Sequence, residues 1–398
     1  MRQVFLLIMI SATISSCVKT RDDARRISSS VNNAESVYLT RDNFDNPVIL
    51  WTEKSTNELT LVFAVSYDDG DSFSQNVSVA LDRDVATHAE GMPKIAFKKD
   101  GTIIVAYEKK APTKENKYAG SICYITSNDQ GKSWSRERYM HSDTVTGRSR
   151  SYFDIEALAD GEVGASWLDI KLNQETDGRS VVFAKTNEAD FFIRETLIDS
   201  SACQCCRIDL YTDIDNNVFV AYRGLRKSMM GKSVRDMMVA TSTDEGTTFT
   251  SPLTISADNW NIDGCPHTGP SLCSNKAGLV TLWYTEGNGN GIYYAHKSNS
   301  QEEFLPRQLV STAGRHPQVS STNDRIAMLW EENSDYSGKP ITTINYRVIK
   351  DGNDVEKNIL TPKDVNAFLP VVTQTKNGFL VAYLMMTGSK VGVYFTKL

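Results

Sequence analysis

A short apolar run that ends in tryptophan or tyrosine occurs seven times along this chain of 398 residues. The runs are VILW, IVAY, GASW, FVAY, VTLW, AMLW and LVAY, which end at Trp51, Tyr107, Trp167, Tyr222, Trp283, Trp330 and Tyr383. Successive copies are 47 to 61 residues apart, which is close to the length of a four-stranded propeller blade with its loops. Each copy follows a β-type run and a turn, and helical periodicity is scarce. The repeat therefore predicts an all-β chain, folded as a β-propeller of seven four-stranded antiparallel blades.

Three of the copies carry the same octapeptide pattern, S-x-D-x-G-x-x-[F/W], after their third strand. These octapeptides are Ser66–Phe73, Ser127–Trp134 and Ser242–Phe249. Aspartate in such a turn accepts hydrogen bonds from backbone N–H groups, and the glycine adopts a positive φ. We therefore expect a structural role, with the closing aromatic packed between blades. A calcium loop is the competing interpretation, but the further carboxylate ligands of such a loop are missing.

The octapeptides resemble the Asp-boxes of BNR-repeat, sialidase-like propellers, and the resemblance covers residues 36–398. It implies a single propeller domain over that range. Sialidases of this superfamily have six blades, so a six-bladed ring with an accessory sheet is the alternative to seven. The last repeat, residues 369–398, offers only three strands. A strand from about residues 25–40 is expected to complete that blade and to close the ring, which removes exposed sheet edges.

The N-terminus has the features of an export signal, with a positive charge at Arg2 and an apolar stretch over Val4–Ile14. Two serines precede Cys17, and this ending resembles a bacterial lipobox. It implies a signal peptide over residues 1–17 and a lipid on Cys17; an ordinary cleaved signal peptide is the alternative. Residues 18–35 are polar and predict a tether. The protein is therefore expected on the bacterial cell envelope, on the outer membrane or at its periplasmic or surface face, held by its lipid alone.

The charge of the chain limits its partners. Lysine and arginine number 43 against 49 aspartates and glutamates, which gives a formal net charge of −6. A chain without a basic footprint is a poor partner for nucleic acid. We expect a monomer whose ligand is a small anionic molecule or an acidic glycan.

The segments that enter the innermost strand of each blade should converge on the propeller axis. They carry polar and reactive side chains, including three of the five histidines, His88, His267 and His316. Such a gathering predicts a pocket there. The loops from the second to the third strand are long in three adjacent blades, at residues 108–119, 168–179 and 223–235, and are expected to form a lid or rim.

The resemblance to sialidases implies an arginine triad that holds the sugar carboxylate, a tyrosine nucleophile assisted by a carboxylate, and an aspartate acid/base. The candidates on the entries are Arg150, Arg207 and Arg315 for the triad, Tyr152 for the nucleophile, Glu90, Asp154 and Asp209 for the carboxylates, and His88 and His316 as further ligand contacts. The Phe/Tyr-Arg-Ile-Pro motif of sialidases is absent, and Met92-Pro-Lys-Ile95 does not replace it. An arginine beside an aspartate on an inner strand is also commonly a buried structural pair.

A second chemistry is carried by cysteine. Cys203, Cys205 and Cys206 precede one innermost strand, and Cys265 and His267 precede the next. Thiolate and imidazole together suit zinc or copper. In an exported protein a disulfide from Cys203 or Cys206 to Cys265 is the alternative.

The third hypothesis, which the sequence favours, is a binding protein without turnover. A positively lined axial pocket would capture an acidic glycan, with Trp260 as a stacking surface for a sugar ring, although aromatics there more often pack in the core. The segments CQCC and DNW-x-I-x-GCPHTGP resemble sialidase-like envelope proteins. An exo-glycosidase acting on sialylated glycans and a zinc or copper protein are the alternatives.

Overall fold

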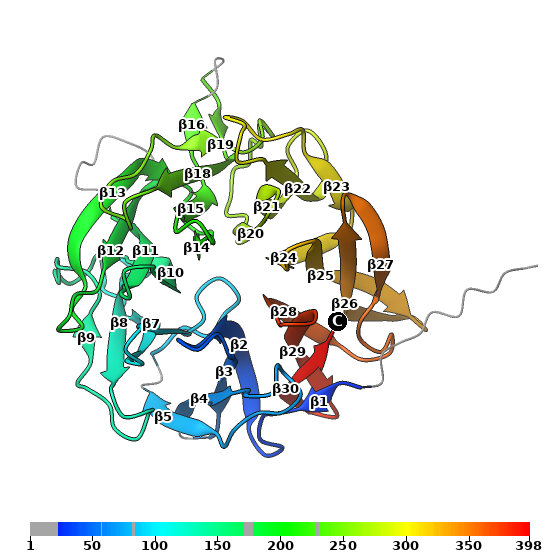
Figure 1. Cartoon of the computed structure of the whole chain (residues 1–398), viewed down its shortest axis with the longest axis horizontal. Coiled ribbons are helices and arrows are strands. Elements are labelled where there is room, and N and C mark those ends of the chain that lie inside the picture. The colour runs from blue at the N-terminus through cyan, green and yellow to red at the C-terminus, as the bar shows by residue number, and fades with distance from the viewer. Residues whose placement is uncertain (1–22, 57, 82–83, 171–177, 228–230) are drawn as a thin grey trace, which may run out of the picture.

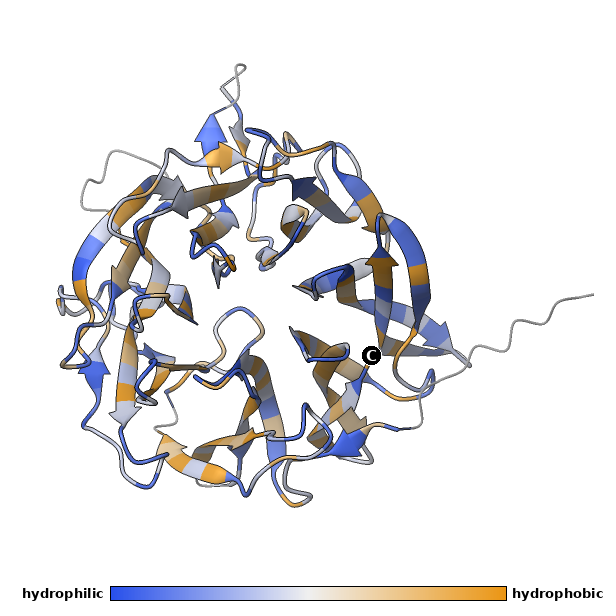
Figure 2. Ribbon diagram, viewed as in Figure 1, coloured by the Kyte–Doolittle hydropathy of each residue, from blue (hydrophilic) through white to orange (hydrophobic). Residues whose placement is uncertain are grey.

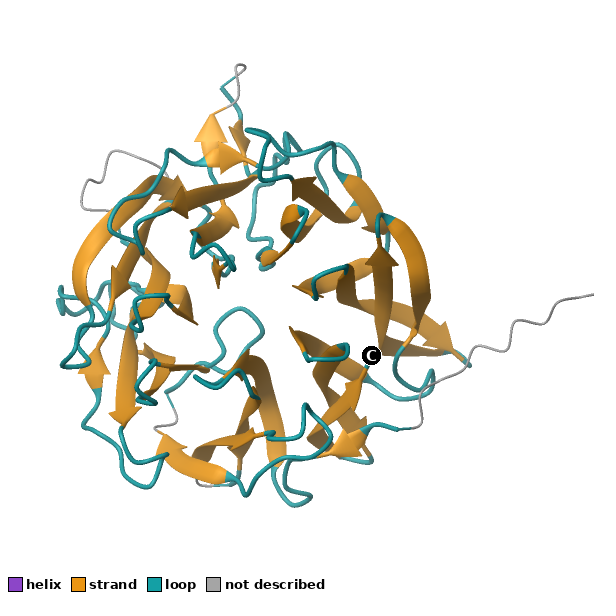
Figure 3. Cartoon of the chain, in the orientation of Figure 1, coloured by secondary structure: helices purple, strands orange, loops and turns teal. Residues whose placement is uncertain are grey.

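The computed structural model describes residues 23–56, 58–81, 84–170, 178–227 and 231–398. Within these ranges the chain forms seven four-stranded antiparallel sheets around a central axis and contains no helix (Figures 1 and 3). The predicted seven-bladed, all-β propeller is confirmed, and the six-bladed alternative is wrong. The expected signal peptide and Cys17 lie outside the described residues.

The strands of each blade follow one another along the chain from the axis outward. The first three blades are β2 (Asn33–Arg41), β3 (Pro47–Lys54), β4 (Leu59–Val65) and β5 (Val77–Leu81); β6 (Lys94–Phe97), β7 (Ile103–Lys110), β8 (Gly120–Ser127) and β9 (Arg138–Tyr139); and β10 (Ser151–Ala157), β11 (Val163–Asp169), β12 (Arg179–Lys185) and β13 (Ile193–Ala202). The fourth blade is β14 (Asp209–Thr212), β15 (Val218–Arg223), β18 (Met237–Ser242) and β19 (Leu253–Thr254), with a small hairpin of β16 (Arg226–Lys227) and β17 (Ser233–Val234) between β15 and β18.

The remaining blades complete the ring. The fifth is β20 (Ser271–Asn275), β21 (Gly278–Thr285), β22 (Gly291–Lys297) and β23 (Gln308–Ser311), and the sixth is β24 (Gly314–Ser321), β25 (Arg325–Tyr336), β26 (Lys339–Lys350) and β27 (Asn353–Ile359). The seventh has β28 (Ala367–Gln374), β29 (Phe379–Thr387) and β30 (Lys390–Lys397) from the C-terminus, and β1 (Arg25–Arg26) from the N-terminus as its outermost strand.

The ring is closed by the two ends of the chain. Arg25 pairs with Phe395 and Arg26 with Tyr394, in antiparallel register. The expected closing strand is therefore present as β1, but it is short. The later part of the expected range does not continue β1; it forms β2, the innermost strand of the first blade. The propeller thus begins ahead of residue 36, and the region predicted as a tether contributes β1 and the start of β2.

The aromatic residue of each repeat anchors the packing between sheets. Trp51, Trp167, Trp283 and Trp330 are almost completely buried. Their indole N–H groups are satisfied by carboxylates, in three cases from the residue two positions later: Glu53 at 2.9 Å, Asp169 at 3.1 Å and Glu332 at 2.9 Å. Apolar residues recur along the strands of the blades, as the hydropathy colouring shows (Figure 2). A buried ring with a paired N–H loses no hydrogen bond on folding, which explains why tryptophan suits this position.

The three octapeptides form the same hydrogen-bonded turn. In each, the serine Oγ accepts from the glycine N–H, at 2.7, 2.9 and 2.8 Å, and the aspartate Oδ1 accepts from the N–H four residues on, at 2.7, 2.9 and 2.8 Å. The closing aromatics Phe73, Trp134 and Phe249 lie 4.9, 6.4 and 5.1 Å, between ring centres, from Phe395, Phe63 and Phe183 of the preceding blades. The turns therefore join neighbouring blades, as expected.

Candidate functional site

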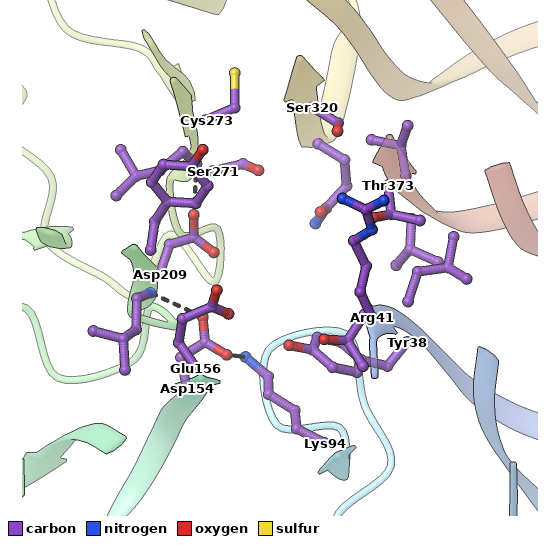
Figure 4. Close-up of a pocket in the computed structure, with 18 of the residues that line it drawn as sticks. Tyr38, Arg41, Lys94, Asp154, Glu156, Asp209, Ser271, Cys273, Ser320 and Thr373 are labelled. Carbon is purple, nitrogen blue, oxygen red and sulfur yellow. Dashed lines mark hydrogen bonds and ion pairs between the residues drawn. The ribbon is translucent and has the colours of Figure 1, made fainter. Parts of the chain in front are cut away.

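A cavity of about 390 Å³ runs along the axis and is lined by residues of all seven innermost strands (Figure 4). Its charged lining is mixed: it includes the carboxylates of Asp154, Glu156 and Asp209 and the cations of Lys94, Arg41 and Arg207. The prediction of a positively lined axial pocket is therefore wrong. Burial, followed by the nearby charges of Asp154 and Asp209, raises the pKa of Glu156 well above its usual value.

Two of the predicted catalytic carboxylates hold blades together at the axis. Asp154 is buried, pairs with Lys94 Nζ at 2.6 Å, and accepts the N–H of Leu210 from the next blade at 2.9 Å. Asp209 in turn accepts the N–H of Leu272 from the blade after that. Burial and the charge of Asp154 raise the pKa of Asp209 to about 7. Asp154 is engaged through both carboxylate oxygens and Asp209 through Oδ2, in each case by a neighbouring blade, so we assign both a structural role.

The three predicted arginines do not form one anion site. Buried Arg207 donates from Nη1 to Glu90 at 3.0 Å and from Nη2 to the carbonyl of Pro317 at 3.1 Å, and its backbone N–H donates to Glu90 at 2.8 Å. Buried Arg150 lies 3.1 Å from Asp143 and 3.3 Å from Asp169. Arg315 alone is exposed, with its guanidinium 4.7 Å from the centre of the Tyr284 ring. Arg207 and Glu90 therefore form a structural ion pair, and Arg150 forms structural ion pairs with Asp143 and Asp169.

Trp260 is not available to a sugar. The side chain is 4% exposed and belongs to the hydrophobic core of the fifth blade. The guanidinium of Arg223 lies 4.8 Å from the centre of the indole ring, and the Tyr284 ring makes a T-shaped contact with the indole. The predicted stacking surface is therefore wrong, because the indole is buried and packs against Arg223 and Tyr284.

A group of polar side chains does come together near the points where β6 and β10 begin. We call this group, His88, Glu108, Tyr152 and Arg179, the mouth cluster. Glu108 is buried and accepts the N–H of Tyr152. A Cβ atom on Gly91 would lie 2.9 Å from both Glu108 Oε2 and His88 Nε2, so a side chain at this position would displace the ends of these two side chains. Tyr152 has a φ of 58°, a backbone conformation that is costly for a bulky residue and is often found at functional sites.

Arg179 completes the mouth cluster. It donates from Nη1 to Ser151 Oγ at 2.7 Å, and its guanidinium lies 5.9 Å from the centre of the Tyr152 ring. Unlike Arg150 and Arg207, it makes no ion pair with any residue inside the described ranges. Arg179 is partly buried, and it lies beside a tyrosine ring with the carboxylates of Glu108 and Asp169 acting on it from beyond ion-pair distance.

Burial sets the protonation of the cluster. It raises the pKa of Glu108 to about 7, and it raises that of Tyr152 with a further contribution from the charge of Glu108. Burial also lowers the pKa of His88. His316 behaves in the opposite way: burial alone would lower its pKa, but its hydrogen bond to Glu331, at 2.9 Å, and the charges of Glu331 and Glu90 together raise it.

Glu108 and Arg179 were not among the predicted site residues. Both lie at the ends of long loops between second and third strands, and Glu108 directly follows the repeat aromatic Tyr107. Glu331 follows Trp330 in the same way and accepts the N–H of Leu369 from the next blade. Glu108 and Glu331 are both acidic residues directly after the repeat aromatic. This shared sequence position is the signal that would have identified Glu108. The lid prediction for residues 168–179 and 223–235 falls partly outside the described residues and stays a prediction.

The predicted cysteine and histidine residues are brought together beside the mouth cluster. The ligand atoms of Cys203, Cys205 and Cys206 lie within 4.8 Å of one another, and so do those of Cys205, Cys265 and His267. Tyr152 packs against the first three. No disulfide joins cysteines in the described part of the chain. Hydrogen bonds from Cys205 and Cys206 lower the pKa of the Cys203 thiol, whereas burial raises that of Cys206.

The comparisons with known proteins support the fold. No protein-family model matches the chain, and no curated protein matches its sequence. Among solved structures, the chain is similar to the polysaccharide lyase Uly1, with a TM-score of 0.55 and 12% identity over 92% of this chain and 90% of that one. It is also similar to the α-L-arabinofuranosidase Arb93A of Fusarium graminearum, with a TM-score of 0.51 and 12% identity over 81% and 95%. The Hadza microbial sialidase Hz136 gives a TM-score of 0.49 and 15% identity over 86% and 73%.

These identities show the fold alone. The class of protein that the fold defines is a seven-bladed β-propeller. A search of the described residues for a helix long and apolar enough to cross a membrane finds none.

Proposed function

We propose that this chain is a lipid-anchored propeller of the bacterial envelope that binds a sugar carrying a carboxylate group at its mouth cluster. The observation that carries the proposal is Arg179, a partly buried guanidinium without an ion-pair partner among the described residues. A guanidinium binds a carboxylate through two parallel hydrogen bonds, and it does so most strongly where water is excluded. The three octapeptides are proposed to be Asp-boxes, and the protein to act as a monomer.

The groups around Arg179 suit a sugar. Tyr152 offers a ring edge and a hydroxyl, His88 offers a ring nitrogen, and Glu108 at a pKa of about 7 is half protonated at neutral pH. A protonated carboxyl can donate a hydrogen bond to a sugar oxygen, or serve as a general acid. The polysaccharide lyase and the arabinofuranosidase that share the fold are both named for action on carbohydrates, which fits a sugar ligand without identifying it.

Turnover is the second candidate, favoured by Tyr152, whose strained backbone is fixed by the carboxylate of Glu108. In an exo-glycosidase of the sialidase kind, Tyr152 would be the nucleophile and Glu108 its assisting carboxylate or the acid/base. Since Arg150 and Arg207 are paired internally, the ligand carboxylate would rest on Arg179 instead of an arginine triad.

Replacing Arg179 by methionine is expected to weaken binding of N-acetylneuraminic acid or glucuronic acid roughly 30-fold or more, because one partner of a desolvated ion pair is lost. Isothermal titration calorimetry of the purified chain measures this. Arg136→Met removes the same charge from an exposed position after the second octapeptide and should bind like the wild type. Equal binding by Arg179→Met and wild type, or no binding of either sugar, would refute the proposal. Release of the fluorophore from a fluorogenic sialoside by the same preparations would establish turnover.

The envelope location rests on the lipobox resemblance at Cys17. Cys17→Ser is expected to abolish incorporation of a radiolabelled fatty acid into the protein, because the thiol that would carry the acyl chain is lost. Metabolic labelling followed by immunoprecipitation measures this. Equal labelling of wild type and Cys17→Ser, or no labelling of the wild type, would show that the lipid anchor is not used.

A further inference from the structure

The cysteine and histidine side chains beside the mouth cluster come from two entry segments that are pressed against each other. The first segment, Cys203–Arg207, leads into β14, and the second, Cys265–Gly269, leads into β20. A Cβ atom on Gly269 would lie 2.4 Å from the carbonyl oxygen of Arg207, so the two backbones are in close contact. Arg207 is itself fixed by Glu90. The two entry segments are therefore adjacent in the folded chain.

The sulfur atoms have the spacing of metal ligands. Cys203 Sγ and Cys205 Sγ are 3.9 Å apart. Two thiolates on one tetrahedral ion, each at a bond length of about 2.3 Å, would be about 3.8 Å apart. Cys265 Sγ and the His267 ring lie within 4.8 Å of Cys205 and of each other, so Cys205 belongs to both halves of the group. Cys203 belongs only to the first group and Cys265 and His267 only to the second, so the exposed pair would have to move toward Cys203 for four donors to bind one ion.

The group also has an open side. A second cavity, of about 230 Å³, is lined by Cys203 and Cys265 together with Gln204 and Arg235. Cys203 and Cys205 are buried, whereas Cys265 and His267 are exposed. An ion can therefore reach the thiolates from solvent, with two of its ligands buried and the other two at the surface.

We propose that Cys203, Cys205, Cys265 and His267 form a binding site for a thiophilic metal ion, Zn²⁺ or Cu⁺, at the junction of the third, fourth and fifth blades. Three thiolates and one imidazole are a donor set that both ions accept in tetrahedral geometry. Binding would displace the thiol protons to solvent. Cys206, within 4.8 Å of Cys203 and Cys205, lies behind the site as a buried neighbour. This site is independent of the sugar proposal, which rests on Arg179.

The site would also act on the fold. A disulfide would use two of these cysteines and leave the imidazole unused, whereas a metal ion uses all four donors from both entry segments. An ion bound only by the folded chain stabilises it in proportion to the logarithm of its concentration over Kd. The blades on either side of the ion would therefore be joined more firmly when it is bound.

Cobalt titration of the reduced, full-length protein tests the proposal, because Co²⁺ bound by thiolates absorbs in the near ultraviolet and Zn²⁺ then displaces it. We expect one equivalent of Co²⁺ to bind, and Zn²⁺ or Cu⁺ to abolish the absorption. Cys205→Ser should weaken binding at least roughly 100-fold, more than the loss caused by removing an outer-shell partner. His267→Asn should weaken it as well, and because His267 is exposed this variant is expected to fold.

Cys273→Ala is the matched control, since Cys273 is a buried cysteine outside the group, and it should bind like the wild type. Absence of the thiolate absorption in the reduced wild type would overturn the proposal. So would equal binding by wild type, Cys205→Ser and His267→Asn. A disulfide between Cys205 and Cys265 in protein isolated from the envelope without metal would overturn it too.

Discussion

Replacing Glu90 by glutamine is expected to lower the free energy of unfolding by about 3–5 kcal/mol, because Arg207 would be left buried without its counter-charge. Glu90 reaches across 117 positions of sequence to bind both the guanidinium and the backbone N–H of Arg207. Both side chains are almost fully buried, at 3% and 6% exposure, so water cannot replace the lost carboxylate. Urea denaturation followed by tryptophan fluorescence measures the change.

Asp324→Asn provides the control for an ion pair on the surface. Asp324 pairs with Lys350 at 2.7 Å, and both side chains are open to solvent. Solvent and salt screen such a pair, so its loss should leave the urea midpoint unchanged within error. A Glu90→Gln variant as stable as Asp324→Asn would show that the Glu90–Arg207 pair does not hold the second and fourth blades together.

Glu108→Gln is expected to change the pH dependence of stability by about 3 kcal/mol between pH 4 and pH 8. Burial raises the pKa of Glu108 from 4.5 to about 7 in the folded chain. A carboxyl whose folded pKa is raised contributes its stability fully below pH 4.5, and that contribution is lost as the pH rises through 7. Glutamine keeps an acceptor for the N–H of Tyr152 and does not ionise, so the variant should gain on the wild type as the pH rises.

Unfolding free energies of both proteins in urea, measured at intervals from pH 4 to pH 8, test this. Asp209 has its pKa raised in the same direction, so the variant should still lose some stability toward high pH. Glu302→Gln, at an exposed position, should follow the wild-type curve. Parallel curves for wild type and Glu108→Gln would contradict a buried, protonated Glu108.

The blades could be predicted from the sequence because each repeat has a buried aromatic at the same place. Trp51 and Trp330, both buried, identify their strands from the local sequence alone, without knowledge of which other segments pack against them. The closing strand was harder to place, since Arg25 and Arg26 have no apolar pattern and form a strand only because β30 offers them an open edge. Local patterns thus determine the repeats, and the ends of the chain are determined by the ring.

The site could be predicted only in part. Cys205, Cys265 and His267 were expected to approach one another because their segments enter neighbouring innermost strands, and the structure brings them together. The arginines were misjudged because a sequence does not reveal which carboxylate reaches a cation. Arg207 is neutralised by Glu90, from two blades away, and Arg179 is left without an ion pair among the described residues.

A crystal structure of the chain grown with N-acetylneuraminic acid would locate the bound sugar most directly. If the mouth cluster is the binding site, electron density for the sugar will lie at that cluster. The sugar carboxylate will be in hydrogen-bond contact with Arg179, and the sugar ring will lie beside Tyr152. Density for the sugar on the octapeptide face, or along the carboxylate-lined part of the axial cavity near Asp209, would contradict it.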